Sequence, residues 1–336
     1  MTNDGPRKIR WGILGYARIA RTELIPAIRR AAGAEFFAIA SREDAKLAEV
    51  RTAFPGVTRT YRDYEELLCD KDVDAIYLPL PNALHREWAI RAAAHGKPVL
   101  CEKPLALTAA ECREMVAAAT AHGVMLMEAF MYRYTDRMRQ VIDVLRSGVL
   151  GEVRQINSTF RFFLSNPASI KLKPELGGGA LYDVGCYPIN FIGLVVDEAA
   201  RRPAGTGPAP ESVAAEAVRA SGVDVGFSAL LRYPGGLIAA LHCGFEAHKR
   251  IGSEIIGTKG ILEVPDTFLD HAGALNLTTG EEKREIPVAL SDRYRLEVED
   301  FSAALAGRRA PLLGLAETLR NAEVLDRLLA AGGGVR

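Results

Sequence analysis

The stretch Trp11-Gly-Ile-Leu-Gly-Tyr-Ala-Arg-Ile-Ala20 decides the fold, because it joins an apolar strand to a helix through closely spaced glycines. We expect Gly12 to permit a tight turn and Gly15 to let the backbone approach a pyrophosphate. The N-terminus of the following helix would then face the anion. Ala17 stands at the third glycine position of this dinucleotide-binding fingerprint, and an ordinary strand-turn-helix corner is the alternative interpretation.

An alternation of short apolar runs and amphipathic stretches surrounds this motif and extends to residue 128. The apolar runs predict strands at residues 11–14, 36–40, 75–78, 99–101 and 124–127. Apolar residues at helical spacing predict helices at residues 17–31, 43–53, 83–95 and 108–122. Strands that alternate with helices form a parallel sheet. The first predicted domain, residues 1–128, is therefore an α/β Rossmann dinucleotide-binding domain with a doubly wound parallel sheet.

The pattern changes after residue 128, where long β-rich segments joined by tight turns indicate an antiparallel sheet. A helix is predicted near residues 135–147, strands at 152–163, 223–233 and 237–245, a surface loop at 201–212, and closing helices near 293–306 and 315–331. We predict a second, α+β domain over residues 129–336 with a large, mostly antiparallel open sheet. Its C-terminal helices could pack back on the first domain.

Charge and cysteine usage narrow the partner and the compartment. The 336 residues include 42 Lys or Arg and 42 Asp or Glu, so no overall field would attract nucleic acid or an anionic membrane, and we expect a small-molecule partner. The five cysteines form no CxxC pair, which argues against a disulfide framework and favours a reducing compartment. We find no signal peptide and no uninterrupted apolar stretch long enough to span a bilayer, and therefore expect a cytoplasmic protein.

The end of the second predicted strand selects the cofactor. An NAD-binding domain usually has an acid there for the ribose hydroxyls, whereas this chain has Ser41 and Arg42, with Lys46 one helical turn later. Two cations and a hydroxyl suit a 2′-phosphate. The pattern favours NADP over NAD, although a solvated helix start would have the same composition.

Three local patterns suggest chemistry, and we expect all three where the doubly wound sheet opens its carboxyl edge to a ligand. They are residues 79–85 (PLPNALH), 101–104 (CEKP) and 177–187 (GGGALYDVGCY). Each has a structural alternative: a helix cap, an exposed loop lysine and a turn. Asp183 and Tyr187 are four residues apart, which on a helix places them on one face, as in an ordinary amphipathic surface stripe, and Pro188 implies a kink there.

Taken in this order, these patterns resemble the glucose-fructose oxidoreductase, inositol dehydrogenase and rhizopine-catabolism (Gfo/Idh/MocA) family over about residues 8–331. Residues 128–134 (EAFMYRY) are similar to the branch of aldose (D-xylose) dehydrogenases, dihydrodiol dehydrogenase and sugar ketoreductases. The resemblance implies a dimer or tetramer formed through the outer face of the second sheet. It also implies that Asn82 and His85 lie beside the nicotinamide ribose, with Glu102 and Lys103 at the nicotinamide.

The predicted site residues follow from the motifs and the resemblance together. The predicted cofactor-binding residues are Gly12, Gly15, Tyr16, Ala17, Arg18, Ile19, Ser41, Arg42, Lys46, Leu80, Pro81, Asn82, His85, Glu102, Lys103, Ala129 and Tyr294. The predicted catalytic residues are Lys103, Asp183 and Tyr187, and no metal is expected, because the histidines lack ligand spacing. Several ketoreductases carry asparagine at the position of Ala129, which leaves the reacting carbonyl open.

The chemistry expected of these residues is hydride transfer between NADP and a carbinol or carbonyl carbon. Tyr187 would act as the acid and base for the hydroxyl proton, Lys103 would favour the phenolate, and Asp183 would orient the lysine or a substrate hydroxyl. An aldose or related polyol is the leading substrate. The alternatives are a nucleotide-sugar 3-ketoreductase with Lys171 and Lys173 near a diphosphate, a trans-dihydrodiol dehydrogenase, a redox-neutral glycosidase and a dinucleotide sensor without catalysis.

Overall fold

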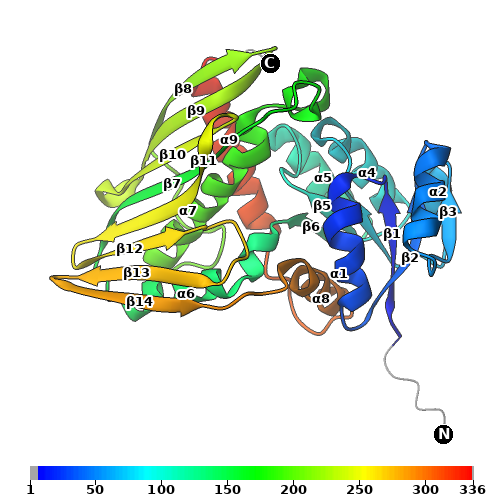
Figure 1. Cartoon of the computed structure of the whole chain (residues 1–336), viewed down its shortest axis with the longest axis horizontal. Helices are drawn as coiled ribbons and strands as arrows, with labels where there is room; N and C mark the ends of the chain where they lie inside the picture. The colour runs from blue at the N-terminus through cyan, green and yellow to red at the C-terminus, as the bar shows by residue number, and fades with distance from the viewer. Residues whose placement is uncertain (1–6, 335–336) are drawn as a thin grey trace, which may run out of the picture. The chain divides into compact units, whose positions relative to one another are not determined.

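The computed structural model describes residues 7–334 and contains two β-sheets (Figure 1). Residue contacts divide the chain into two compact units. The first includes the chain up to Leu105 together with Ala110–Met131 and Asp292–Leu313. The second includes Ala106–Ala109, Tyr132–Ser291 and the chain from Gly314 onward. A segment near the C-terminus thus belongs to the first unit.

The sheet of the first unit is parallel throughout and has the strand order β3-β2-β1-β4-β5-β6. Its strands are β1 (Ile9–Leu14), β2 (Ala34–Ala40), β3 (Arg59–Tyr61), β4 (Ala75–Leu78), β5 (Val99–Glu102) and β6 (Leu126–Ala129). The chain moves outward from β1 to β3 and then returns to the other side of β1 with β4. Ligands of such sheets bind outside the carboxyl ends of the strands where the order reverses. The predicted Rossmann fold is confirmed.

Helical segments join these strands as the apolar spacing predicts. They are η1 (Ala20–Leu24), α1 (Ile25–Arg30), α2 (Asp44–Ala53), α3 (Tyr64–Cys69), η2 (Asn82–Leu84), α4 (His85–Ala94) and α5 (Ala109–Ala121). The short α3 was not predicted, although Asp63 caps it by accepting a hydrogen bond from the Glu65 amide at 2.7 Å. The late helix α8 (Arg293–Leu305) packs on α1 and β2, with the ring of Phe301 5.0 Å from that of Trp11.

The second sheet has the order β14-β13-β12-β11-β7-β10-β9-β8 and is antiparallel except where β10 pairs with β7. Its strands are β7 (Val153–Phe163), β8 (Ser212–Ala220), β9 (Val223–Arg232), β10 (Ile238–Gly244), β11 (Glu246–Gly257), β12 (Gly260–Pro265), β13 (Gly273–Thr279) and β14 (Glu282–Val288). The predicted large, mostly antiparallel open sheet is confirmed. The sequence analysis had not named β8 or β11 to β14.

Helices α6 (Asp136–Ser147), α7 (Cys186–Ala199) and α9 (Leu315–Ala331) lie along one face of this sheet (Figure 1). The segment Pro174–Ala199, which ends with α7, is long and apolar enough by composition to cross a membrane, although Glu175, Asp183, Asp197 and Glu198 interrupt it. Its most apolar window is 89% buried inside the protein. Packing against β7 and β10 accounts for that composition, since a core helix is apolar on all sides.

Candidate active site

The carboxyl edge of the parallel sheet gathers most of the predicted cofactor residues. Gly15 follows β1, Ser41 and Arg42 follow β2, Leu80 to Asn82 follow β4, Glu102 and Lys103 stand at the end of β5, and Ala129 ends β6. Parallel strands end at one edge of their sheet, so separate motifs meet there. Two of the three patterns suspected of chemistry lie at this edge. The third, residues 177–187, belongs to the second unit.

The tight turn predicted at Gly12 is made by Gly15. Gly12 lies inside β1, and a Cβ there would come within 2.8 Å of Leu67 and 2.9 Å of Val73, so it permits close packing under the sheet and makes no turn. Gly15 makes the turn, with φ at +98°, and a Cβ would come within 2.9 Å of Leu80. Only glycine fits this turn without strain. The bare backbone at Gly15 fits a pyrophosphate that must approach closely.

The residues after Gly15 enter a helix that begins with a π-helical turn. Tyr16 is buried and its hydroxyl lies 3.5 Å from Glu49, while Ala17 and Ile19 are half-buried and Arg18 is exposed. Ile19 already has helical dihedral angles before η1. The first amides of a helix have no partner within it, so this N-terminus can bind an anion.

The residues after β2 form a small polar site. Ser41 is buried, its amide donates to the Tyr61 carbonyl at 3.0 Å, and its hydroxyl accepts from the Glu43 amide at 3.3 Å. Lys46 forms an ion pair with Glu43 at 2.5 Å. Of the two predicted cations, Lys46 is thus already neutralised by a neighbour and Arg42 is the one open to a ligand.

Three side chains hold the loop that carries Lys103. The Tyr77 hydroxyl donates to Glu102 at 2.6 Å, the His85 ring meets the Pro104 carbonyl at 3.0 Å, and Glu128 accepts from the Leu105 amide at 2.9 Å. These side chains come from β4, α4 and β6. The peptide bond between Lys103 and Pro104 is cis. The lysine therefore projects from a loop fixed on both sides of it.

His85, predicted to lie beside the nicotinamide ribose, directs its ring to the protein backbone. The side chain is fully buried, with Nε2 2.8 Å from the Leu80 carbonyl and Nδ1 3.0 Å from the Pro104 carbonyl. Burial lowers the pKa of His85 and outweighs the two carbonyls, which oppose it. Both ring nitrogens face the backbone, so His85 ties the loop after β4 to the Lys103 loop and positions both.

Tyr294 lies on α8 in the first unit and is nearly buried, with the guanidinium of Arg293 5.2 Å from its ring. The pKa of Tyr77 lies well above its usual value, chiefly because the side chain is buried and also because Glu102, Glu297 and Tyr294 are close. Burial also raises the pKa of Glu297, a carboxyl group that the sequence analysis did not single out. Tyr77 and Glu297 therefore favour their neutral forms.

The second unit buries Tyr187 in an aromatic cluster. Its ring centroid lies 5.3 Å from Phe160, 5.5 Å from Phe268 and 5.9 Å from Tyr132, and only 5% of the residue is exposed. This burial excludes the amphipathic surface stripe. Asp183 lies one turn earlier in η6 (Leu181–Gly185), a π-helical turn that leads into α7, and such turns are frequent at functional sites.

Asp183 forms an ion pair with Lys171, whose ammonium also lies 5.6 Å from the Phe162 ring. Lys171 belongs to the second unit, as does Asp183, whereas Lys103 belongs to the first. The carboxylate thus has a cationic partner within its own unit.

Backbone conformation or close approach requires glycine at each of the three positions before η6. Gly177 has φ at +76°, and a Cβ on Gly178 would come 2.6 Å from the Lys171 carbonyl oxygen. Gly179 has φ at +128°, and its Cβ would meet Asp224. The Asp224 carboxylate accepts from the Leu181 amide at 2.7 Å and thereby caps the helical segment. The three glycines therefore do more than form a turn, because they also let the loop pack closely on β9.

Sequence reasoning missed a buried polar cluster behind Tyr187. Asn190 accepts from the Tyr132 hydroxyl at 2.5 Å and donates to Glu317 at 2.6 Å, and Glu317 forms an ion pair with Arg133. All four side chains are buried. Tyr132 and Arg133 stand in the stretch EAFMYRY that carries the branch resemblance. No spacing within the sequence connects them with residues 190 and 317.

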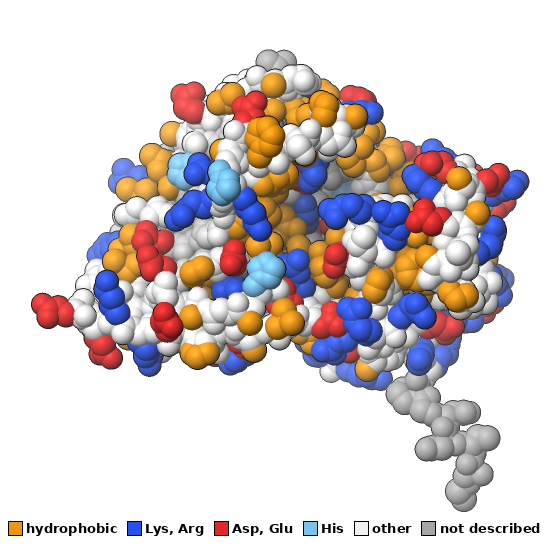
Figure 2. All heavy atoms as spheres, viewed as in Figure 1, with side chains coloured by type: hydrophobic (Ala, Val, Ile, Leu, Met, Phe, Trp, Pro, Cys, Tyr) orange, Lys and Arg blue, Asp and Glu red, His pale blue; other side chains and the backbone are white. Residues whose placement is uncertain are grey.

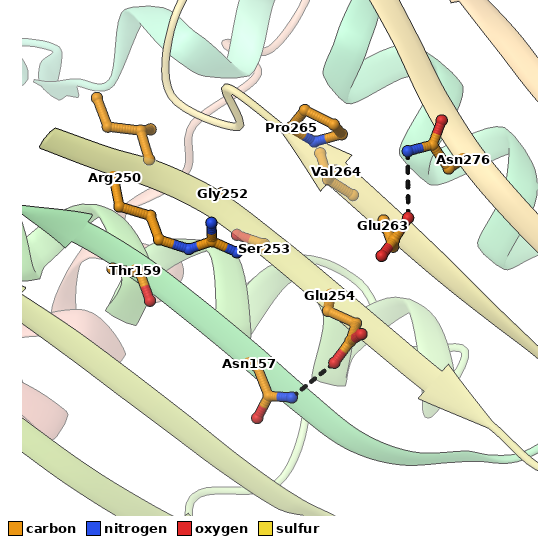
Figure 3. Close-up of a pocket in the computed structure, with 11 residues that line it drawn as sticks. Asn157, Thr159, Arg250, Gly252, Ser253, Glu254, Glu263, Val264, Pro265 and Asn276 are labelled. Carbon is orange, nitrogen blue, oxygen red and sulfur yellow. Dashed lines mark hydrogen bonds between the residues drawn. The ribbon is translucent and has the colours of Figure 1, made fainter.

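A polar hollow of about 480 Å³ lies on the opposite face of the second sheet from the helices (Figure 3). Asn157 donates to Glu254 at 2.8 Å and Asn276 donates to Glu263 at 3.1 Å across its strands. Arg250 also lines it. It contains none of the predicted site residues, so it is no candidate for the chemistry.

Comparisons with known proteins agree with this architecture. Residues 9–130 match the oxidoreductase family with an NAD-binding Rossmann fold, and residues 138–263 match the GFO/IDH/MocA C-terminal domain. The chain is 36% identical to a D-xylose 1-dehydrogenase (NADP(+)) of Haloferax volcanii, covering 95% of each chain. It is 30% identical to a trans-1,2-dihydrobenzene-1,2-diol dehydrogenase of Xenopus laevis, covering 95% of this chain and 97% of the relative.

A solved relative is KijD10, a 3-ketoreductase from Actinomadura kijaniata in complex with NADP and TDP-benzene. It superposes with a TM-score of 0.88 at 30% identity, over 97% of this chain and 98% of that one. The fold, the glycine turn and the matched domains define an NAD(P)-dependent oxidoreductase. The chain belongs to the Gfo/Idh/MocA family, as the sequence motifs predict. The predictions of an enzyme and of this cofactor class are confirmed.

Proposed function

We propose that the protein is an NADP-dependent dehydrogenase that oxidises an aldose or a related polyol and reduces the matching carbonyl. The observation that carries this proposal is the pair Ser41 and Arg42 at the carboxyl end of β2, in place of the acid that binds the ribose of NAD. The similarity to an NADP-dependent D-xylose 1-dehydrogenase over 95% of both chains supports the substrate class.

In the proposed chemistry, Tyr187 transfers the proton and Lys103 stabilises the negative charge. NADP, held by residues such as Gly15, Ser41 and Arg42 at the carboxyl edge of the parallel sheet, would supply the acceptor for the hydride of the carbinol carbon. As the phenolate that Lys103 favours, Tyr187 takes the hydroxyl proton and becomes the neutral phenol, and its buried aromatic surroundings keep water from competing for that proton. Lys103 stabilises the developing negative charge with its ammonium, since the loop that carries it is fixed by Glu128 and His85.

Of the two roles predicted for Asp183, we propose the second, which is to orient a substrate hydroxyl. Because it pairs with Lys171, the two side chains together can accept and donate hydrogen bonds to neighbouring sugar hydroxyls. The pairing also weakens the case for a nucleotide-sugar substrate. A diphosphate needs uncompensated cations, and the charge of Lys171 is already balanced by Asp183.

The 3-ketoreductase activity remains the second candidate, because KijD10 matches nearly the whole chain at a TM-score of 0.88. Both candidates use the same hydride and proton transfers. They differ in the group attached to the sugar, so a comparison of free aldoses with nucleotide-linked keto-sugars distinguishes them.

We also propose a homo-oligomer that forms through the helix-free face of the second sheet. Phe163, Val218, Leu230 and Ile238 are exposed on its strands, at 47% to 68% of their surface. Exposed apolar groups on one face suit association. Elsewhere on the surface in Figure 2, acidic and basic side chains are interspersed. A Leu230→Lys variant would shift sedimentation toward monomer, and an unchanged oligomer would count against this face.

A cytoplasmic location fits the five free cysteines, four of them buried. Localisation of a tagged chain by cell fractionation tests this.

The test of the proposed function is turnover of the purified protein, followed by absorbance of the reduced nicotinamide. NADP or NAD is combined with a panel of aldoses, polyols and a trans-dihydrodiol, and the reverse reaction is run with a keto-sugar nucleotide. NADPH formation with an aldose supports the proposal. Turnover restricted to the keto-sugar nucleotide, the dihydrodiol or NAD would replace it. Release of free sugar from a glycoside without net NADPH would indicate the redox-neutral reaction.

A further inference from the structure

We propose that Tyr64 is a cofactor-specificity residue: its ring, supported by Trp88, holds the guanidinium of Arg42 as the floor of an adenosine 2′-phosphate subsite. The proposal rests on the proposed function, because it concerns how the same enzyme selects NADP. Neither aromatic residue belongs to a motif that the sequence singled out for the cofactor.

The three side chains come together from three elements of the first unit. The guanidinium carbon of Arg42 lies 5.0 Å from the ring centroid of Tyr64 and 5.9 Å from that of Trp88. Tyr64 begins α3 and Trp88 is buried on α4, and their rings meet edge to face at 4.9 Å with an interplanar angle of 89°. A ring braced in this way offers the arginine one fixed face.

The charges around Arg42 leave its hydrogen-bond donors to a ligand. The neighbouring acids already have cationic partners, since Glu43 pairs with Lys46 and Asp44 pairs with Arg62. Within residues 7–334, no carboxylate lies within ion-pair distance of Arg42, and the side chain is exposed. A stacked guanidinium keeps its N–H groups free at its edge, where they can hold a phosphate.

The position of Tyr64 links this cation to the dinucleotide turn. Its hydroxyl lies 3.5 Å from the point where a Cβ of Gly15 would stand. In a Rossmann domain the pyrophosphate lies at the turn after the first strand and the adenine ribose at the end of the second. Tyr64 therefore lies between the two, and the face of Arg42 away from Tyr64 can stack on adenine.

This arrangement makes a specific demand on the cofactor. NADP has a 2′-phosphate to meet the prepositioned N–H groups, and NAD has a hydroxyl there. An arginine that is already held loses less freedom on binding than a mobile one, so the aromatic ring raises affinity for the phosphorylated cofactor alone.

The experiment measures the dissociation constants of NADP, NAD and adenosine 2′,5′-bisphosphate by calorimetry on the full chain and four variants. In Tyr64→Leu the constants for NADP and the bisphosphate should rise about tenfold, with NAD within about twofold. Tyr64→Phe keeps the ring face and should bind NADP within about twofold of the parent. Arg42→Ala should lose more NADP affinity than Tyr64→Leu does. The double variant Arg42→Ala with Tyr64→Leu should lose no more NADP affinity than Arg42→Ala alone.

Equal weakening of NADP and NAD in Tyr64→Leu would make Tyr64 a scaffold residue and overturn the proposal, as would unchanged binding of both. A melting temperature for each variant identifies misfolding. If Tyr64→Leu misfolds, Tyr64→Phe still shows whether NADP affinity depends on the aromatic ring or on the hydroxyl group of Tyr64. Because the bisphosphate has no nicotinamide, its binding does not depend on catalysis. Absence of aldose turnover with selective NADP binding intact would reject the proposed substrate and leave this inference standing.

Discussion

The Tyr132 hydroxyl donates a hydrogen bond to Asn190 at 2.5 Å, and the two side chains reach one another from segments 58 residues apart. Asn190 stands three residues after Tyr187 on α7, and the Tyr132 ring packs 5.9 Å from the Tyr187 ring. Tyr132 therefore restrains both the helix and the phenol of the proposed acid and base. Glu317 and Arg133 complete the hydrogen bonds of Asn190 inside the protein.

Tyr132→Phe should lower both stability and turnover. It removes the donor to the Asn190 oxygen, and a weakened buried hydrogen bond costs about 1–2 kcal/mol of unfolding free energy. Urea unfolding measures that cost. The aromatic packing remains, so NADP binding should stay unchanged while kcat falls more than KM changes. A variant with the expected loss of stability but full kcat would show that Tyr132 supports the fold alone.

Tyr187→Phe should abolish most turnover and keep the cofactor site. Loss of a general acid and base typically costs 10²–10⁴ in rate, so kcat should fall by at least about 100-fold. NADP affinity should stay within about twofold, because removing one hydroxyl leaves the phosphate and ribose contacts intact. Stopped-flow measures kcat, and calorimetry measures the dissociation constant of NADP. Phe160→Leu serves as the packing control, since it disturbs the same cluster without removing a proton carrier.

His85 should make stability depend on pH below neutrality. Its pKa is lowered in the folded protein, so the unfolded chain takes up the proton first as the pH falls through the ordinary value of about 6.5. The unfolding free energy should therefore be fully present above that pH and decline below it, by at most about 1.4 kcal/mol per pH unit. His85→Gln should flatten this decline in urea unfolding between pH 7 and 5. An identical decline in the variant would assign it to other groups.

The parallel sheet was predictable because its signals are local. Apolar runs and helical spacing alternate along the chain, and the Gly12 to Ala17 motif marks the turn. The three-residue β3 lacks an apolar run, and the edge strand β14 carries the mixed polar sequence EKREIPV, so pairing with neighbours decides whether these segments form strands. The role of Gly12 could not be read locally, since it depends on Leu67 and Val73 packed beneath the sheet.

The site was predictable where its residues follow strands of one sheet. Arg42 and Lys103 were found because a motif position places them at the carboxyl edge. The ion pair of Lys171 with Asp183 and the capping contact of Asp224 with Leu181 were not predicted, because the fold brings these partners together. The same holds for His85, whose ring nitrogens meet two backbone carbonyls that only the folded loops bring together.

Gly179→Ala should be among the most damaging single-methyl changes in the second unit. The residue has φ at +128°, a conformation that alanine rarely adopts, and the new Cβ would collide with Asp224. Backbone strain costs about 1–3 kcal/mol, so the unfolding free energy should fall by at least about 2 kcal/mol. The loop that leads to Asp183 would shift, so KM for the sugar should rise as well.

Gly56→Ala is the matched control for that substitution. It adds the same methyl group where nothing lies within 4 Å and where φ is not positive, so its stability should change by less than about 1 kcal/mol. The double variant Gly179→Ala with Asp224→Ala separates collision from strain. Because Asp224→Ala alone removes the cap of Leu181, the cost of Gly179→Ala is compared with and without Asp224. A smaller cost without the carboxylate would assign the loss to the collision, and an equal cost would assign it to the backbone. A Gly179→Ala protein as stable and active as the parent would contradict the requirement for glycine at this position.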